Sequence, residues 1–160
     1  MSRSAPVQRA LRECRQCGIS MLEVLIAVLI VSIGFLGMAA LQARALSTNN
    51  SAMARSMATI ASYSILDAMR ADLVAAEAGA YNTTVTATAN GCPTPTGTLA
   101  STQLQTWCAQ LASSLGAAST TSGTVNCSNT GDCTVTVQFD DSRAGAGGSA
   151  TQRVVTRAGL

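Results

Sequence analysis

Residues 19–41 read ISMLEVLIAVLIVSIGFLGMAAL, and Glu23 is the only charged residue among them. About 20 apolar residues of helix cross the roughly 30 Å hydrocarbon core of a bilayer, so this run is long enough to span a membrane. A carboxylate at the centre of such a helix costs about 2.5–3.5 kcal/mol on insertion scales. We therefore expect Glu23 to have a partner.

The segment before this run is basic. It contains four arginines and only one acidic residue, Glu13. They are Arg3, Arg9, Arg12 and Arg15. No comparable cluster follows residue 41. The positive-inside rule therefore predicts a single-pass protein with its amino terminus in the cytoplasm and the rest of the chain outside.

An ordinary secretory signal peptide is the alternative interpretation of this region. The stretch Ala43-Arg44-Ala45 offers a small-x-small cleavage site, and cleavage there would start the mature chain at Leu46. However, a signal h-region has roughly 7–15 apolar residues, and this run is longer and contains an acid near its start. We therefore prefer a retained membrane helix.

The segment GISMLEVLIA, residues 18–27, resembles the class III signal of the type IV pilins and pseudopilins. In that family a membrane peptidase cuts after the glycine on the cytoplasmic side and methylates the new terminal amine, and the apolar segment is retained. The resemblance implies cleavage between Gly18 and Ile19, methylation of Ile19, and Glu23 as the fifth residue of the mature chain. The family usually has Phe where this chain has Ile19.

Cleavage would place a cationic amine on Ile19, four residues before Glu23. In an array of parallel helices the nearest positive charge for this carboxylate is a terminal amine, its own or a neighbour's. Such a pair is much stronger in a low-dielectric environment than in water. It would also fix the axial offset between subunits, as a buried polar residue fixes coiled-coil register. The alternative is a lone Glu23 that reaches the membrane interface.

The resemblance extends beyond residue 27, and there it is to one subgroup of the family. Stretches between residues 18 and 81 are similar to the PilV-type minor pilins. They are SIGFLGMAALQ (32–42), NNSA (49–52), Arg55-Ser56, Ala58, DAMRA (67–71) and GAY (79–81). After residue 82 the likeness is loose and depends on Cys92-Pro93 and Trp107-Cys108.

This resemblance implies a minor pilin of a type IV pilus, which helps initiate pilus assembly and supports adhesion and twitching motility. Its partners would be the prepilin peptidase, other minor pilins, the major pilin and the inner-membrane assembly platform. The protein would be stored in the inner membrane with a periplasmic head and then move to the surface pilus. A minor pseudopilin of type II secretion is the second hypothesis, and an exported binding protein with a removed signal is the third.

Composition argues against several other function classes. The chain has no histidine and no lysine, which excludes Ser-His-Asp, Cys-His and Schiff-base chemistry. Asp140 and Asp141 are adjacent, so on a strand they would point to opposite faces, and we expect a solvated strand end. After residue 18 there are six arginines and seven acids, and no basic patch with aromatic residues predicts nucleic-acid binding. We expect no enzyme activity and no cofactor.

The cysteines divide between the leader and the exported part. Cys14 and Cys17 would leave with the leader. The other four are Cys92, Cys108, Cys127 and Cys133. Disulfides persist outside the cytoplasm, and we prefer the pairs Cys92–Cys108 and Cys127–Cys133, because the second pair flanks a turn-forming stretch. A Cys₄ zinc site is the alternative, but the spacings are not those of paired knuckles.

The predicted fold class is α+β, with a long helix packed on a small antiparallel sheet. The expected parts are a cleaved leader (1–18), a transmembrane or filament-core helix (19–41), an amphipathic continuation (42–80) and a globular head (81–160). We expect the helix to continue to about Ala78 and stop at Gly79. Leu46, Met53, Met57 and Ile60 follow helical spacing. Ile65, Met69 and Leu73 then form a stripe on a rotated face, and this stripe should pack on the head.

Within the head, periodicity predicts a helix over Leu99–Leu115 with Trp107 as a core residue. Alternation predicts a strand over Thr134–Phe139 that pairs with Thr124–Cys127. A short strand at Val85–Ala87 and a last strand near Gln152–Thr156 complete the prediction. The Gly-rich stretch 140–150 lacks the Lys and the following helix of a phosphate loop, so we interpret it as a turn.

Overall fold

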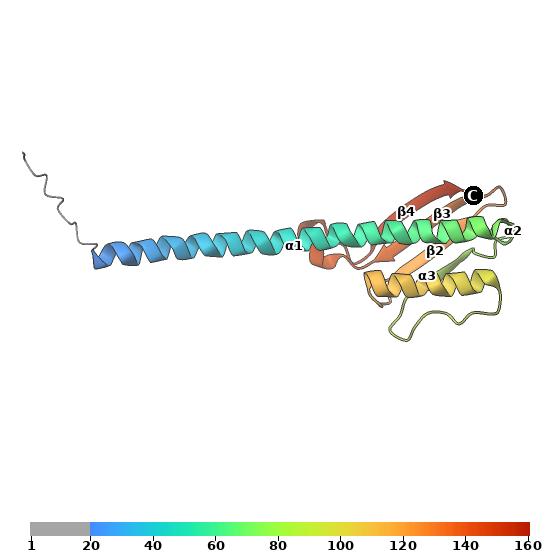
Figure 1. Cartoon of the computed structure of the whole chain (residues 1–160), viewed down its shortest axis with the longest axis horizontal. Helices are drawn as coiled ribbons and strands as arrows, with labels where there is room; N and C mark the ends of the chain where they lie inside the picture. Colours follow the sequence, from blue (N-terminus) through green and yellow to red (C-terminus); the bar gives the residue numbers. More distant parts are fainter. Residues whose placement is uncertain (1–19) are drawn as a thin grey trace, which may run out of the picture. The chain divides into compact units, whose positions relative to one another are not determined.

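The computed structural model describes residues 20–160, so the predicted leader (1–18) and Ile19 lie outside the described part (Figure 1). The chain divides into two compact units between Ala40 and Leu41. In chain order, the elements are α1 Met21–Ala71, α2 Leu73–Glu77, β1 Thr83–Thr86, α3 Leu99–Leu115, β2 Ser122–Cys127, β3 Asp132–Phe139, the 3-10 helix η1 Ser142–Gly147 and β4 Gln152–Gly159.

The second unit contains the predicted antiparallel sheet. Its four strands follow the order β1-β2-β3-β4, and α3 is inserted between β1 and β2. The register places Val125 opposite Val135, and Val137 opposite Val154. The expected α+β class is confirmed: a long helix packs on a four-stranded antiparallel sheet.

One face of the sheet is the core of this unit. Alternate residues of β3 are buried, from Cys133 to Phe139, while Thr134 and Thr136 on the other face are half-exposed. In Figure 1, α3 lies beside the end of α1, and both cover the sheet. The two helices are joined by the indole N–H of Trp107, which donates to the carbonyl of Ala61 at 2.9 Å. The predicted helix and its buried tryptophan are therefore confirmed.

The predicted face that packs on the head is confirmed at two of its three positions. Ile65 and Met69 are buried as expected, but Leu73 is exposed. The buried residues of α1 are Ser51, Ala58, Ala61, Ser62, Ile65, Leu66 and Met69. Small side chains allow the helix backbone to lie close to the sheet and to α3. Ile65, Leu66 and Met69 are the larger apolar side chains on this buried face, whereas Leu46, Met53, Met57 and Ile60 are exposed.

The helix also ends earlier than expected. It stops at Ala71 rather than near Ala78, and the short α2 follows after Asp72, whose φ of −130° and ψ of 51° are not helical. Buried Tyr81 explains the break, because its hydroxyl lies 3.1 Å from Asp72 Oδ2 and also contacts Gln103 Oε1. Gly79, with a φ of +82°, ends the helical region after α2, as predicted.

Tyr81, which contacts Asp72 at this break, has a strongly raised pKa. Burial is the main reason that the pKa of Tyr81 rises to about 12, and the hydrogen bond to Asp72 and the charge of Asp72 add to the effect. The phenol has one proton and two oxygen neighbours. Turning the Gln103 amide makes its Nε2 the donor to the phenol oxygen, so both contacts are then satisfied.

The strand predictions differ from the structure mainly at their ends. β2 and β3 pair as expected. β1 begins at Thr83 and ends before Ala87, and β4 continues to Gly159, beyond the expected end. The stretch expected to be a turn contains η1, and its hydrogen bond Gly148 N–H to Gly145 O closes the last turn at 3.0 Å.

Candidate functional site

The amino-terminal turn of α1 presents Glu23 on a capped helix end. The backbone N–H of Leu22 donates to Ser20 Oγ at 3.3 Å, and the backbone N–H of Glu23 donates to Ser20 O at 2.9 Å. A carboxylate in the first turn also interacts favourably with the helix dipole. Ser20 and Glu23 have the S-x-x-E spacing of a capping box, a signal that our sequence analysis missed.

The apolar part of α1 is exposed along its whole length. Residues 20–41 are all exposed, and a window of this helix has a mean hydropathy of 2.8 with none of it buried. By length and composition it can cross a membrane, although a signal sequence passes the same test. A surface of this size and hydrophobicity requires a lipid or protein environment.

Glu23 lies on a strongly apolar face of this helix. Ile26, Ala27 and Ile30 follow it at helical spacing, and together they line one shallow surface groove. Among residues 20–160, Glu23 makes no ion pair. Its predicted partner, the amine of Ile19, lies outside the described residues, so the pairing stays a prediction.

Gly34 and Gly37 do not interrupt α1. The helix continues through both, and a Cβ at either would meet nothing within 4 Å among the described residues. Neither glycine is therefore required by a contact in this structure. Space for close helix–helix approach is compatible with this arrangement.

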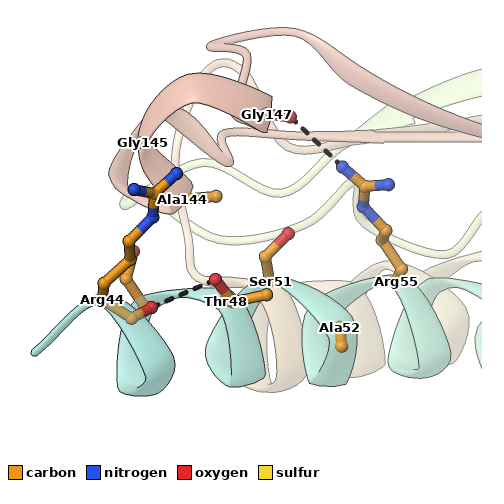
Figure 2. Close-up of a pocket in the computed structure, with 9 residues that line it drawn as sticks. Arg44, Thr48, Ser51, Ala52, Arg55, Ala144, Gly145 and Gly147 are labelled. Carbon is orange, nitrogen blue, oxygen red and sulfur yellow. Dashed lines mark hydrogen bonds between the residues drawn. The ribbon is translucent and has the colours of Figure 1, made fainter. Parts of the chain in front are cut away.

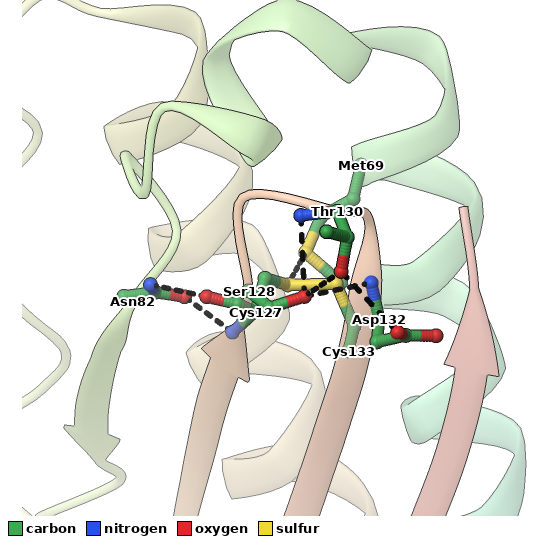
Figure 3. Close-up of a disulfide and its surroundings, with 7 residues drawn as sticks. All are labelled: Met69, Asn82, Cys127, Ser128, Thr130, Asp132 and Cys133. Atoms are coloured by element: carbon green, nitrogen blue, oxygen red, sulfur yellow. Dashed lines mark hydrogen bonds between the residues drawn. A yellow bond between two sulfur atoms is a disulfide. The ribbon is translucent and has the colours of Figure 1, made fainter.

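The four cysteines outside the leader form two disulfides, in the pairing that the sequence favoured. Cys92–Cys108 ties the loop before α3 to that helix, and Cys127–Cys133 joins register partners of β2 and β3 (Figure 3). Asn82 holds the same corner, because its amide donates to Cys127 O at 2.9 Å and accepts from Cys127 N–H at 2.7 Å.

The remaining cysteines and the alternative of a metal site were also considered in the prediction. Cys14 and Cys17 lie outside the described residues. In the part of the chain that the structure describes, no group of three or more His, Cys, Asp or Glu residues is placed to hold a metal ion.

Asp141 is a residue whose role the sequence analysis missed. We expected Asp140 and Asp141 to form a solvated strand end, and for Asp141 this is wrong. Its side chain is buried, accepts a hydrogen bond from Ser51 Oγ at 2.6 Å, and lies 3.4 Å from Arg55 Nη2. A buried carboxylate requires such partners, and here both come from α1. Asp141 thus fastens the end of β3 to the long helix.

Asp140 behaves as expected for a solvated acid. It is exposed, and its Oδ1 accepts from the Ser142 backbone N–H at 2.8 Å. This backbone hydrogen bond, followed by one from the Ser142 side chain, lowers the pKa of Asp140 below its ordinary value. Two adjacent aspartates therefore have opposite environments.

The comparisons with known proteins identify one motif. The family model described as the prokaryotic N-terminal methylation motif matches residues 14–39. This range contains the predicted cleavage position, Glu23 and most of the apolar run. No curated protein and no solved structure matched the chain.

Proposed function

We propose that this chain is a minor pilin of a type IV pilus, and the N-terminal methylation motif at residues 14–39 supports this proposal. The motif implies processing by the prepilin peptidase and assembly with other pilin-like subunits. Together with the exposed apolar helix, it indicates anchoring in the inner membrane before filament assembly. The minor-pilin role is a more specific assignment than pilin or pseudopilin, and the resemblance of residues 18–81 to the PilV-type minor pilins supports it.

The observation that carries the proposal is Glu23 as the only charged residue in the exposed, predominantly apolar first part of α1, residues 20–41. In the proposed mechanism, the peptidase cuts between Gly18 and Ile19 and methylates the Ile19 amine. The mature helix then stays in the inner membrane, with the head in the periplasm. During assembly, Glu23 of one subunit pairs with the amine of a neighbour, which fixes their axial offset in a medium of low dielectric constant.

Exposed apolar residues in the second half of α1 support the same proposal. Leu46, Met53, Met57 and Ile60 follow helical spacing and are all exposed. An exposed apolar stripe on an extracytoplasmic protein is typical of an interaction surface. In a filament, neighbouring subunits would cover it. The two disulfides would stabilise the head outside the cell.

Adhesion and twitching motility would follow from a minor pilin that helps start pilus assembly with the other minor pilins, the major pilin and the assembly platform. The alternative is a minor pseudopilin of type II secretion, since the motif is shared. Sheared surface pili should contain the chain, and its deletion should reduce piliation and twitching. Loss of exoprotein secretion on deletion, with the chain missing from sheared pili, would reject the pilus assignment.

The role of Glu23 can be tested separately from cleavage. Glu23→Ala should still be processed, because the peptidase depends mainly on the glycine, but its incorporation into pili should fall strongly. Glu77→Ala is the matched control, since Glu77 is the only other glutamate after residue 18 and lies exposed in α2. Normal incorporation of the Glu23 variant would contradict the pairing.

A further inference from the structure

A cavity in the second unit has two arginines in its wall. It has a volume of about 690 Å³ and lies between α1 and η1. Its lining residues are Arg44, Ser47, Thr48, Ser51, Ala52, Arg55, Ala144, Gly145 and Gly147. Figure 2 shows both guanidinium groups extending from α1 toward η1, with the side chains of Thr48 and Ser51 between them. Small-molecule sites have volumes of about 300–1,000 Å³, so the cavity can hold more than a simple ion.

Both guanidinium groups have hydrogen-bond donors to spare. Within residues 20–160, Arg44 makes no ion pair and its guanidinium has no hydrogen-bond acceptor. Arg55 reaches Asp141 and Gly147 O at 3.4 Å, and both contacts use the same nitrogen, Nη2. A guanidinium has five N–H donors in a planar fork that matches phosphate oxygens.

The surrounding charges favour an anion. Asp141 is the acid closest to the cavity, but its carboxylate is already bound by Ser51 and Arg55. Asp140 and Arg143 lie in the adjacent surface hollow, where the Arg143 carbonyl accepts a hydrogen bond from Ser47. Three arginines thus face two acids in this region.

The position of Arg44 in the sequence indicates where the anion comes from. The apolar run ends at Leu41, and Arg44 follows three residues later. Basic side chains this close to the end of a membrane-spanning segment lie at the level of the lipid headgroups. The hydroxyl groups of Thr48 and Ser51 on the next turns already donate to the Arg44 carbonyl and to Asp141, so the guanidinium groups are the donors left for an anion.

We propose that this cavity binds the phosphate of an anionic phospholipid headgroup while the chain is stored in the membrane. Arg44 binds the phosphate oxygens at the end of the cavity nearest the apolar run, and Arg55, about three helical turns further along α1, adds positive charge at the other end. The inference rests on the membrane-anchored state of the proposed function. It adds a lipid contact that must be released, or carried along, when the subunit enters a filament.

The test uses the purified full-length chain in a non-ionic detergent, with bound lipid counted by native mass spectrometry. The probes are phosphatidylglycerol, phosphatidylcholine with the same acyl chains, and inorganic phosphate. We expect phosphatidylglycerol to bind about tenfold more tightly than phosphatidylcholine, and Arg44→Gln to remove about this factor, as for loss of one charge-assisted hydrogen bond. Arg157→Gln, on the exposed face of β4, is the matched control and should change nothing.

Each other outcome overturns the proposal. Equal weakening by Arg44→Gln and Arg157→Gln would show unspecific attraction by net charge. Binding of inorganic phosphate as tight as that of phosphatidylglycerol would make the site a free-anion site rather than a lipid site. Absence of any preference for the anionic lipid would reject it outright.

Arg55 needs separate treatment because it also contacts Asp141. The double variant Arg44→Gln/Arg55→Gln should bind phosphatidylglycerol more weakly than Arg44→Gln alone. Its Trp107 fluorescence must match that of the unchanged chain, which shows that the double variant is folded. Failure of lipid binding would leave the proposed function intact if the chain is still found in sheared pili. Absence from pili with lipid binding retained would reject the minor-pilin role alone.

Discussion

Replacement of Asp141 by alanine should loosen the head from the long helix. The buried carboxylate accepts from Ser51 Oγ at 2.6 Å and lies 3.4 Å from Arg55 Nη2. Both partners belong to α1, whereas Asp141 follows the end of β3. The substitution therefore removes a connection between segments 86 to 90 residues apart in the sequence.

The expected loss of stability follows from these two contacts. A hydrogen bond to a charged group contributes about 1.5–3 kcal/mol, and the Ser51 bond is buried. The Arg55 pair adds less than about 1 kcal/mol, because the arginine side chain is 46% exposed and its charge is screened by water. We expect Asp141→Ala to lower the free energy of unfolding by about 2–3 kcal/mol in total.

Asp140 supplies a matched control one residue away. It has the same side chain but is exposed, and its hydrogen bond is to the nearby Ser142 N–H. Asp140→Ala should therefore change the free energy of unfolding far less than Asp141→Ala. The assay is denaturant unfolding of the full-length chain in detergent, followed by the fluorescence of Trp107, the only tryptophan and a buried one.

A double-mutant cycle with Ser51→Ala isolates the contact. The two single variants should each be destabilised, and the double variant should lose less than their sum, with a coupling of about 1 kcal/mol or more. Equal effects of Asp140→Ala and Asp141→Ala, or a coupling near zero, would refute the reasoning.

Three further predictions concern the core of the head. Gly123→Ala should destabilise the protein by about 1–3 kcal/mol or more in the same unfolding assay, because the added Cβ would overlap the indole ring of Trp107; a neutral effect would contradict the packing. Stability should fall as the pH rises from about 10 to about 12, because the unfolded chain loses the Tyr81 proton first, and Tyr81→Phe should flatten this fall. A disulfide that closes a longer loop restricts the unfolded chain more, and Cys92–Cys108 spans 16 residues whereas Cys127–Cys133 spans 6. Removal of the first should therefore lower the free energy of unfolding by about 3 kcal/mol, and removal of the second by about 2 kcal/mol. A lower denaturation midpoint for the variant without Cys127–Cys133 would argue against this model.

Local patterns in the sequence predicted much of the fold. The helix Leu99–Leu115 has the predicted bounds, because its apolar period and its flanking residues are local signals. Alternation in Thr134–Phe139 likewise identified β3, and a turn between two cysteines identified its hairpin partner. These features depend on neighbours within a few residues.

The errors concern contacts between distant segments. Periodicity cannot say which of two faces of α1 packs on the head, and here the face of small residues does, with Ala58 and Ala61 fully buried. The break at Asp72 depends on Tyr81 and Gln103, which the helical composition of that region does not reveal. Asp141 looked solvated because its partners Ser51 and Arg55 are far away in the sequence.

In the proposed mechanism, the leader is removed after Gly18 so that the first mature residue, Ile19, can pair with Glu23. Mass spectrometry of the amino-terminal peptide from the surface-exposed protein tests this directly. We expect a peptide that begins at Ile19, with a methyl group on its amine. A surface form that still carries residues 1–18, or one that begins at Leu46, would contradict it.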